Sequence, residues 1–399
     1  MQPSQRERNY LIRLLSDIIE DVQPQNPPEA LDWIKLYRLA VWHNVSNMLF
    51  CGIDRLKDDK KPPQDVMLKF HSHFKKAMAK EATQHIAVEQ LLETFEENNI
   101  ACMPLKGYLV KYLYPRPDMR LMADIDILFK NEQTEQVKNL MLASGFTVQH
   151  QGGNHDIYYK KPFLNIEMHR RLISVESPYS YYLNKTWYRA KLKDGCKYTY
   201  ELSLEDFYIY LLIHLTKHYA GGGTGIRSFL DIWLYHRSYA KEMNWNYIWA
   251  ELEKINLREF ADKVLGLCEV WFGNAPNNEL YDEMTQYIFS SGVYGTQKHA
   301  VISAMNKKGG KKHPPGRIKH LYRLKLFFPP LSTMKILYPF VETLPILLPV
   351  CWMLRGFRCL IFKPRHTLQM LNKVQAISEE ELASIRNLHE KSGLFRQKG

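Results

Sequence analysis

The sequence predicts an α+β protein in which a small mixed sheet is embedded in a largely helical chain. Residues before 99 and after 204 carry apolar side chains at three- and four-residue spacing with few breakers, which is typical of amphipathic helices. Between these segments, short apolar runs are bounded by glycine, proline and lysine, which indicates strands and turns. Helices packed on one side of a small sheet are a stable way to bury the apolar face of each.

The predicted elements follow one another in a simple order. Helices are expected over 5–20, 32–49 and 66–98, and the pattern is helical again from residue 204. Gly145 is a natural terminator for the helix of the central part. Between 99 and 170 the expected elements are a strand over 100–105, a turn at Lys106–Gly107, a strand over 123–129, a helix over 132–144, and strands over 157–159 and 164–169.

These elements divide the chain into four predicted regions. The change of pattern at Asn99 separates a helical segment from the mixed core, and a second change follows the last predicted strand. The predicted regions are an N-terminal helical region over 1–98, a mixed core over 99–170, a helical domain over 171–330 with a basic segment over 298–335, and a C-terminal helical tail over 331–399.

Composition favours a cytoplasmic globular protein. Apolar residues make up 45% of the chain and charged residues 24%, which are ordinary values for a soluble protein. The six cysteines show no C-x-x-C spacing, so neither a zinc site nor a disulfide framework is indicated. The first thirty residues carry charges throughout, unlike a secretory signal. Residues 336–352 contain Glu342 and three prolines, so we expect no transmembrane segment there, with shallow contact to a membrane surface as the alternative.

The net charge of +12 is concentrated in one stretch. No acidic residue occurs between Glu283 and Glu342. Such a stretch can serve a polyanion, which could be a triphosphate, a nucleic acid or an anionic membrane surface. The alternative is a solvated lysine-rich loop around Gly309. The basic residues are Lys298, Lys307, Lys308, Lys311, Lys312, Arg317, Lys319, Arg323, Lys325 and Lys335.

Two acidic residues follow a lysine–glycine turn in the predicted core. On a strand over 123–129, Asp124 and Asp126 project from the same face because side chains alternate with period two. Two carboxylates held in this way can bind a divalent metal, and ligation by oxygen alone suits Mg²⁺ or Mn²⁺. The turn at Lys106 and Gly107 offers backbone N–H groups and a cation to phosphates. The pattern predicts metal-assisted nucleotidyl transfer.

A third acid can complete this cluster. Glu167 and His169 share a face of the strand over 164–169, and Glu167 joins the acid pair if the two strands are neighbours. Two metals ~3.5–4 Å apart could then bridge the α-phosphate and the attacking oxygen. His169 could orient Glu167 or contact a phosphate, with a purely structural histidine as the alternative. His155, two residues before the strand expected over 157–159, is a similar candidate.

Together these residues resemble the DNA polymerase β-like nucleotidyltransferase superfamily, and more narrowly the bacterial group called the uncharacterised nucleotidyltransferase family. The similarity extends over residues 30–365. The matching pieces are Pro104-Leu105-Lys106-Gly107, Leu113-Tyr114-Pro115, Arg120, Asp124-Ile125-Asp126, Glu167-x-His169, His214-x3-His218, Arg227-x3-Asp231, and the tail residues Tyr338-Pro339, Leu348-Pro349, Trp352 and Arg355.

The resemblance implies a palm-like core that moves a nucleoside monophosphate from an NTP, most readily ATP, to an acceptor hydroxyl or phosphate and releases pyrophosphate. By resemblance, the catalytic and metal-binding residues are Asp124, Asp126 and Glu167, and the metal is Mg²⁺ or Mn²⁺. The nucleotide-binding residues that it implies are Lys106, Gly107 and Arg120 at the triphosphate, and His169, His218 and Arg227.

One departure from the superfamily concerns the phosphate turn. The superfamily places a serine after the glycine and a shorter gap before the acid pair, whereas Tyr108 follows Gly107 in this chain. Phosphate binding must then rely on Lys106 or another cation. His214 and His218 have zinc-chelating spacing but lack the glutamate of H-E-x-x-H, so packing is the favoured interpretation.

Two further functions remain as alternatives. The fold could hold a nucleotide or an acidic partner without catalysis, or the basic segment could direct transfer to a nucleic acid. Acceptors compatible with the sequence are a sugar phosphate, an antibiotic-like small molecule, a protein side chain and a nucleic-acid end.

Overall fold

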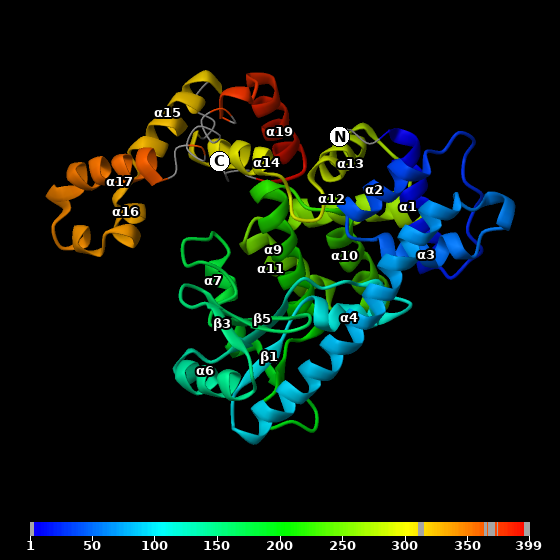
Figure 1. Ribbon diagram of the computed structural model, residues 1–399, viewed down its shortest axis with the longest axis horizontal. Helices are drawn as coiled ribbons and strands as arrows, with labels where there is room; N and C mark the ends of the chain where they lie inside the picture. Colours follow the sequence, from blue (N-terminus) through cyan, green and yellow to red (C-terminus); the bar gives the residue numbers. More distant parts are fainter. Residues whose placement is uncertain (1–3, 310–314, 363–364, 366–371, 373, 395–399) are drawn as a thin grey trace. The chain divides into compact units, whose positions relative to one another are not determined.

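A computed structural model describes residues 4–309, 315–362, 365, 372 and 374–394. These residues fall into two compact units, one within Met1–Lys217 and Thr224–Val293, the other within His218–Gly223 and Tyr294–Gly399. The predicted α+β class is confirmed, since a five-stranded mixed sheet lies in a largely helical chain (Figure 1). The four regions predicted from the sequence stay a prediction about independent folding.

The N-terminal part is helical, as predicted. Its helices are α1 (Gln5–Ile19), α2 (Trp33–Trp42), α3 (Ser46–Asp54) and α4 (Gln64–Glu97). The single helix predicted over 32–49 is wrong, because Asn44 adopts a left-handed conformation (φ 56°) that separates α2 from α3. Asparagine tolerates this conformation better than most residues, and a helix cannot continue through it.

The sheet has the strand order β1-β2-β5-β4-β3. The central strands β2 and β5 are parallel, and the remaining pairs are antiparallel. The edge strand β3 was not predicted, because its mostly exposed side chains lack the apolar alternation of a half-buried strand. The bounds are β1 (Cys102–Pro104), β2 (Ile125–Phe129), β3 (Thr147–His150), β4 (His155–Lys160) and β5 (Leu164–His169).

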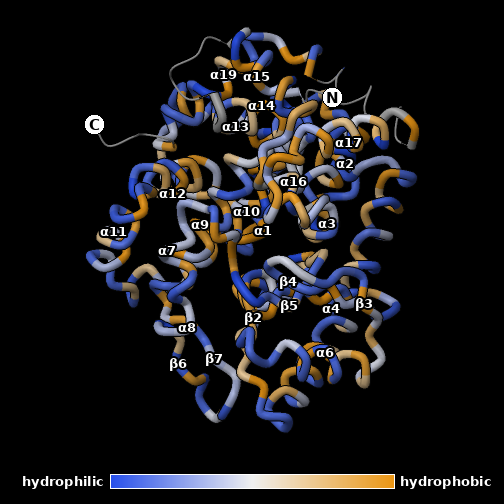
Figure 2. The backbone as a smooth tube through the Cα atoms, turned by 90° about the vertical axis from the view of Figure 1, so that its left-hand side faces the viewer, coloured by the Kyte–Doolittle hydropathy of each residue, from blue (hydrophilic) through white to orange (hydrophobic). Residues whose placement is uncertain are grey.

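One face of the sheet packs against α4 and α6 (Thr134–Ala143). The buried cluster joins Val88 and Phe95 of α4, Met141 of α6, and Ile127 and Ile166 of the central strands. Figure 2 shows α4 and α6 beside these strands. Gly145 follows α6 with φ 80°, which confirms the predicted terminator. Since alternate residues of a strand point to opposite faces, the residues between the packed ones are presented to the other side.

Helices follow the sheet within the first unit. They are α7 (Ser180–Leu183), α8 (Thr186–Arg189), α9 (Leu204–Gly222), α10 (Ile226–Tyr239), α11 (Trp245–Lys254), α12 (Arg258–Phe272) and α13 (Glu279–Ser291), with the short pair β6 (Lys191–Leu192) and β7 (Tyr200–Glu201) before α9. The helical pattern predicted from residue 204 is confirmed by α9, which begins at Leu204 and runs into the second unit.

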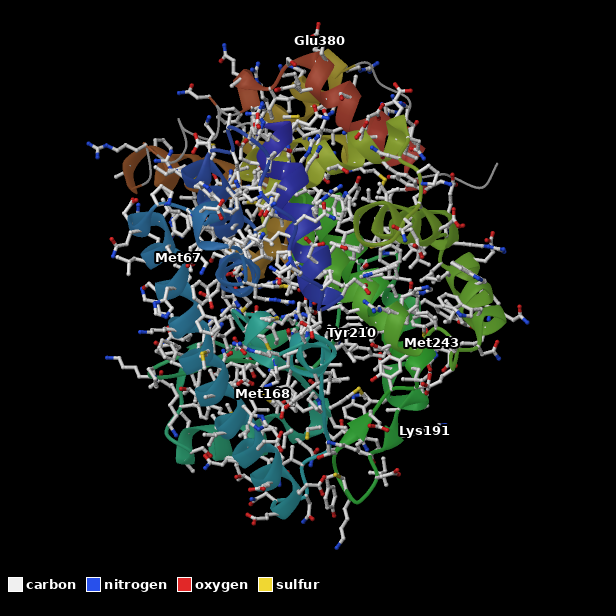
Figure 3. All side chains as sticks on the ribbon, turned by 90° about the vertical axis from the view of Figure 1, so that its right-hand side faces the viewer. Met67, Met168, Lys191, Tyr210, Met243 and Glu380 are labelled. Carbon is white, nitrogen blue, oxygen red and sulfur yellow. The ribbon has the colours of Figure 1, made fainter. Side chains whose placement is uncertain are left out.

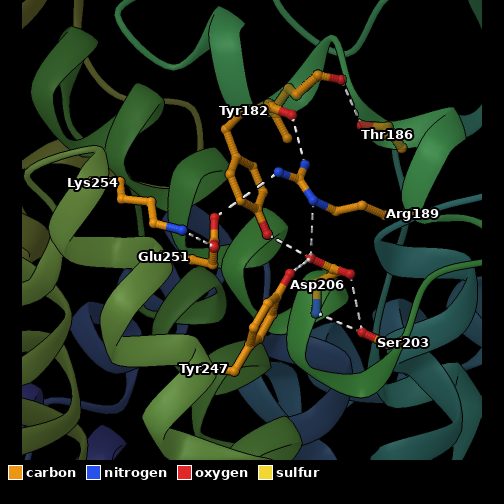
Figure 4. A network of polar contacts seen from close by, with 9 residues as sticks. Tyr182, Thr186, Arg189, Ser203, Asp206, Tyr247, Glu251 and Lys254 are labelled. Carbon is orange, nitrogen blue, oxygen red and sulfur yellow. Dashed lines mark hydrogen bonds and ion pairs between the residues drawn. The ribbon is translucent and has the colours of Figure 1, made fainter.

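A buried carboxylate fixes the start of α9. Asp206 accepts hydrogen bonds from the hydroxyls of Tyr182 (2.6 Å) and Tyr247 (2.9 Å), and the Nε of Arg189 lies 3.7 Å away (Figure 4). These partners come from α7, α11 and α8, so one side chain ties three helices to the first turn of α9. A negative charge is also favourable at the N-terminus of a helix.

The second unit contains α14 (Gln297–Gly309), α15 (Pro315–Phe327), α16 (Leu331–Leu337), α17 (Leu348–Phe362) and α19 (Glu379–Lys391). Much of the basic segment is therefore helical rather than a loop. Lys319 of α15 donates to the carbonyl of Ile377. Lys311 and Lys312 lie outside the described residues. Among the helices that the structure describes, none combines the length and apolarity needed to cross a membrane.

Candidate active site

The site is built on the two parallel central strands, which place two predicted acids side by side. Asp126 of β2 and Glu167 of β5 are Cα partners. The predicted adjacency of the two strands is therefore confirmed. Because Ile125 and Ile127 point into the apolar cluster beneath the sheet, Asp126 is presented to the opposite face. Two carboxylates thus meet on the sheet face that α4 and α6 leave uncovered.

Asp126 is the most buried acid of the site, with 4% of its surface exposed. The Nζ of Lys106 lies 2.8 Å from its Oδ1, and the Nε2 of His169 lies 2.7 Å from the same oxygen. Burial by itself would raise the pKa of Asp126. The positive charge of Lys106 and the hydrogen bond of His169 outweigh burial, so the pKa lies well below its ordinary range. Asp126 is therefore ionised.

Lys106 lies in a tight turn between β1 and a short helix, α5 (Gly107–Val110). Its backbone has φ 44°, which is uncommon for a residue other than glycine. Burial would lower the pKa of Lys106, but the charge of Asp126 outweighs it and the pKa is raised. The turn therefore holds a permanent cation against the central acid.

Gly107 is required by close packing in this turn. A Cβ atom at this position would lie 2.8 Å from the Cζ and 3.2 Å from the Nη2 of Arg120. Contacts below 3 Å are essentially never made by a real Cβ atom. The Arg120 guanidinium thus leaves no room for a side chain at residue 107, which explains the glycine of the Lys-Gly pair. The approach of the backbone to phosphate, predicted from the sequence, is a second reason for glycine at this position.

Arg120 is held in a bidentate ion pair. Its Nε and Nη2 lie 2.9 and 2.6 Å from the two carboxylate oxygens of Asp231 on α10. The hydroxyl of Tyr114 also donates to Asp231, at 2.7 Å. Arg227, four residues earlier on the same helix, donates to the carbonyl of Leu121 at 2.6 Å, just before the acid pair.

Asp124 lies one residue before the start of β2 and is half-buried. Burial raises the pKa of Asp124, and the negative charge of Asp126 raises it further, with a smaller effect of Glu167. The charges of Lys106 and Arg227 act in the opposite direction. The three predicted acids therefore share one electrostatic environment with Lys106 and Arg227.

Glu167 is the third acid, and it lies between two imidazoles. The Nε2 of His169 is 3.4 Å and the Nε2 of His155 is 3.6 Å from its Oε2. The hydrogen bond of His169 lowers the pKa of Glu167 and outweighs the effect of burial. Glu167 is therefore ionised near neutral pH and can act as a ligand or as a proton acceptor.

Sequence reasoning missed two residues of α9 that act on this site. Tyr210 is buried, which raises its pKa, and its next strongest electrostatic neighbours are Lys106 and Asp126 (Figure 3). Lys217 interacts electrostatically with Lys106, Asp126 and Glu167. The signal that could have identified them is the spacing of Tyr210, His214 and Lys217 at i, i+4 and i+7, which places them on one face of the helix.

His218 and His214 differ in what the structure says of them. The ring of His214 lies 6.4 Å from that of Tyr210, centroid to centroid, within the first unit. His218 is the first residue of the second unit, so its predicted contact with the nucleotide stays a prediction. The predicted roles of Arg120, His169 and Arg227 at the nucleotide stay predictions as well.

The donor set fits a divalent metal ion. Asp124, Asp126 and Glu167 offer carboxylate oxygens, the ligands that Mg²⁺ and Mn²⁺ prefer. Burial is the largest cause of the raised pKa of Asp124, and the negative charge of Asp126 adds to it, a combination that is common at functional sites. The neighbouring Lys106 supplies a second positive charge at the same place.

Comparison with known proteins identifies the family of the chain. Residues 29–273 match the family described as "Uncharacterised nucleotidyltransferase". Among solved structures, the chain is similar to the solution structure of the antibiotic-resistance factor ANT(2'')-Ia, with 13% sequence identity over 47% of this chain and 96% of that chain and a TM-score of 0.33. A likeness of this size carries no argument about substrate. No curated protein matches the chain.

Proposed function

Because the chain belongs to the uncharacterised nucleotidyltransferase family of the DNA polymerase β-like superfamily, it is a nucleotidyltransferase, and we propose that its reaction is metal-dependent. The proposed reaction moves a nucleoside monophosphate from an NTP, most readily ATP, to an acceptor hydroxyl or phosphate and releases pyrophosphate. An NTP substrate is consistent with the cytoplasmic location expected from the sequence.

The observation that carries this proposal is the meeting of Asp126 and Glu167 on neighbouring strands beside Lys106. In the proposal, Asp124, Asp126 and Glu167 hold Mg²⁺ or Mn²⁺. The metal would supply neutralisation of the charge that develops on the phosphates during transfer. Asp126 and Glu167 are carried by strands, and Asp124 directly precedes β2, so the relative positions of the two strand acids are fixed before substrate binds.

Lys106 is proposed to bind the triphosphate. It is the cation nearest to the acids, and the serine hydroxyl common in the superfamily is replaced here by Tyr108. The hydroxyl of Tyr108 is directed elsewhere, toward a carboxylate oxygen of Glu89 on α4. Phosphate recognition in the turn therefore relies on the ammonium and on the backbone N–H groups of residues 106 and 107.

Glu167 is proposed to accept the proton of the acceptor hydroxyl. Its lowered pKa keeps it ionised, and its two histidine neighbours hold the carboxylate in place. Catalysis would then arise chiefly from positioning the acceptor oxygen against the α-phosphate and from neutralising charge. Arg120 contributes by fixing the turn through Asp231 and Gly107, while His169, His218 and Arg227 are proposed to face the nucleotide.

The proposal is tested with α-³²P-labelled NTPs. The protein is incubated with each NTP, Mg²⁺ or Mn²⁺ and a cell extract, and both label transfer and pyrophosphate release are measured. Asp126→Asn and Glu167→Gln should each reduce transfer at least 100-fold, the range that loss of a key transition-state group produces. Asp65→Asn is the control, because Asp65 is an exposed acid paired with Lys69 on α4.

Two outcomes would overturn parts of the proposal. Transfer at the wild-type rate in both Asp126→Asn and Glu167→Gln would show that these acids do not form the active site. Metal-dependent NTP binding without pyrophosphate release would identify a nucleotide-binding protein instead of an enzyme. Label transferred to RNA or DNA, with binding that weakens steeply as salt rises, would identify a nucleic-acid acceptor.

A further inference from the structure

Glu167 is accompanied by two imidazole nitrogens in addition to the acids. His155 of β4 and His169 of β5 are Cα partners, so both rings lie at the same level of the sheet. The ligand atoms of His155, Glu167 and His169 all lie within 4.8 Å of one another. Among the residues that the structure describes, these three were identified as a group that could hold a metal ion.

The three side chains are arranged for access from one side. The His155 side chain is 32% exposed, that of Glu167 is 18% exposed and that of His169 is 9% exposed. Solvent therefore reaches the cluster past His155, while His169 forms its floor. The Oδ1 of Asp126, at 2.7 Å from the Nε2 of His169, places a fourth donor atom at the buried end.

This donor set differs from that of an ordinary magnesium site. Mg²⁺ prefers oxygen ligands in a strict octahedral arrangement and retains several waters, whereas imidazole nitrogen suits Mn²⁺ less and Zn²⁺ more. Two imidazoles and one carboxylate, with a position left open, are the ligands of many catalytic zinc sites. The cluster therefore has the composition of a transition-metal site beside the all-oxygen pair Asp124 and Asp126.

We propose that His155, Glu167 and His169 form a transition-metal site that prefers Zn²⁺ and Mn²⁺ to Mg²⁺. Binding of the metal stands on the geometry of these three residues. Its use as one of the metals of nucleotidyl transfer rests on the proposed function. The open face of the sheet would then carry two unlike metal positions, one of oxygen alone and one of mixed nitrogen and oxygen.

The test measures metal binding without nucleotide. The full chain is freed of metal with a chelator and titrated by calorimetry with Zn²⁺, Mn²⁺ and Mg²⁺. Zn²⁺ should bind most tightly and Mg²⁺ at least tenfold more weakly than Mn²⁺, following the general order of affinities. His155→Ala should weaken Zn²⁺ and Mn²⁺ binding at least tenfold. The control is His85→Ala on α4, whose ring contacts the Tyr112 hydroxyl away from the cluster.

Pulsed electron paramagnetic resonance gives a direct readout of the ligands. Bound Mn²⁺ should show coupling to imidazole nitrogen, and the coupling should decrease in His155→Ala and in His169→Ala. Unchanged nitrogen coupling in both variants, or equal affinity for Mg²⁺ and Mn²⁺ in the wild type, would overturn the inference. If the wild type binds Zn²⁺ through these histidines but transfers no nucleotide, the proposed function fails and the metal site stands.

A separate observation concerns the second unit, where α17 exposes an apolar face. Val350, Met353, Leu354, Phe357 and Ile361 are all exposed, with Met353 63% and Ile361 67% exposed. Their spacing of three and four residues places them on one side of the helix. A surface helix normally exposes its polar side, so this face indicates an interaction partner.

The opposite side of α17 is already packed. Cys351 is fully buried in a cluster with Met334 and Val341, and Trp352 packs against the same cluster. The exposed face therefore does not belong to the core of its own helical hairpin. The preceding turn continues it, since Leu344 and Ile346 are exposed as well, Ile346 to 84%.

Charge identifies the partner. Glu342 is the single acidic residue between Glu283 and Glu379 in the sequence. Arg358 is exposed on α17 itself and Lys325 is exposed on α15, while Lys335 is paired with Glu342 at 2.9 Å and Arg355 donates to the carbonyl of Leu326 at 2.8 Å. An apolar helix face bordered by cations is the composition of helices that lie in the interface of a membrane with anionic lipids.

We infer that α17 and the turn before it dock on an anionic membrane surface. The helix lies in the plane of the interface with Met353 and Phe357 inserted among the acyl chains, and Arg358 meets the lipid headgroups. This surface is independent of the proposed reaction, because its residues lie in the second unit, apart in sequence from the acids.

The test is flotation of the full chain with lipid vesicles. Vesicles containing 30% phosphatidylglycerol, on the order of natural anionic content, should capture the protein, and vesicles of phosphatidylcholine alone should capture much less. Phe357→Asp with Met353→Asp should abolish capture without loss of circular dichroism, since both positions are exposed. Ile86→Asp on α4, at 58% exposure, is the matched control and should leave capture intact.

Two results would overturn this inference. The first is equal capture by neutral and anionic vesicles that the double variant does not change. The second is a concentration-dependent dimer in sedimentation that the double variant abolishes while no vesicle is bound, because the face would then be an interface between two copies of the chain.

Discussion

The Lys106 ammonium and the Asp126 carboxylate form a buried ion pair, with Nζ 2.8 Å from Oδ1. The two residues are twenty positions apart, and the pair joins the turn after β1 to the middle of β2. Each residue was predicted as part of a nucleotide site, but not as the partner of the other. The pair links phosphate recognition to the metal-binding acids. A phosphate that binds Lys106 weakens its contact with Asp126, and a metal ion that binds Asp126 weakens the same contact.

Replacing Lys106 with methionine should destabilise the protein by about 3 kcal/mol, since removal of one partner leaves a buried charge uncompensated. Urea denaturation measures this free energy of unfolding. Combining Lys106→Met with Asp126→Asn should cost less than the sum of the two single changes, because neither charge is then left alone. Additive effects in the double variant would show that the two side chains do not interact.

Replacing Gly107 with alanine should destabilise the protein by about 2 kcal/mol and reduce transfer, because the new Cβ meets the Arg120 guanidinium and the surroundings must shift. The control is Gly356→Ala on α17, where a Cβ meets nothing within 4 Å. Gly356→Ala should instead increase the free energy of unfolding by ~0.5–1 kcal/mol, which is the usual gain when alanine replaces glycine in a helix. Equal effects of the two substitutions on thermal unfolding would contradict the packing explanation.

Replacing Asp231 with asparagine should cost about 3 kcal/mol, because the Arg120 charge loses its bidentate partner in a buried position. The KM for NTP should also rise, since the guanidinium that packs on the phosphate turn is released. The single variant Arg120→Lys should also lose stability and show a raised KM for NTP, because an ammonium cannot form the planar double contact with Asp231. A variant that keeps wild-type stability and KM would exclude Arg120 as a positioning residue.

Acid should weaken the fold through His43 before the carboxylates are protonated. Burial lowers the pKa of His43 from 6.5 to about 3. Below pH 6.5 the unfolded chain takes up a proton at His43 that the folded protein refuses, so the free energy of unfolding falls as pH falls from 6.5 toward 3. The contribution of His43 to the slope of the unfolding free energy against pH approaches ~1.4 kcal/mol per pH unit.

The matched variant for this effect is His43→Asn. The backbone N–H of Ile226 donates to the Nδ1 of His43 at 3.3 Å, and the asparagine oxygen can take its place. Between pH 6.5 and 5 the variant should lose stability less steeply than the wild type. Parallel curves of unfolding free energy against pH would rule out His43 as the titrating group.

The parts of the site that were predictable from the sequence depend on local geometry. Alternation along a strand placed Asp126 on the open face, and the same rule paired Glu167 with His169. The partners reached across the fold were not predictable. Asp231 follows Arg227 on the same helix, and nothing in this local pattern indicates that Asp231 also takes the buried bidentate contact of Arg120, which lies 111 positions earlier.

The elements show the same division. The long helix α4 and the strand β5 follow from periodicity, and both have nearly the predicted bounds. The break between α2 and α3 depends on the left-handed conformation of Asn44, which cannot be predicted from the spacing of apolar residues. Tyr210 and Lys217 were missed because their helix is apolar on several sides, so the face that meets the acids is not marked by polarity.

The apolar neighbours of the two central acids also protect the register of the strands. Asp126 and Glu167 lie 41 positions apart in the sequence, and the alignment of their strands brings both carboxylates within reach of the His169 imidazole. A slip by one residue would turn Ile166 or Met168 to the open face and drive Glu167 into the apolar core, which is strongly unfavourable. Substitutions that weaken the apolar cluster beneath β2 and β5 should therefore move Asp126 and Glu167 apart before the protein unfolds. The loop between β3 and β4 can change in length, because it takes no part in the pairing of β2 with β5.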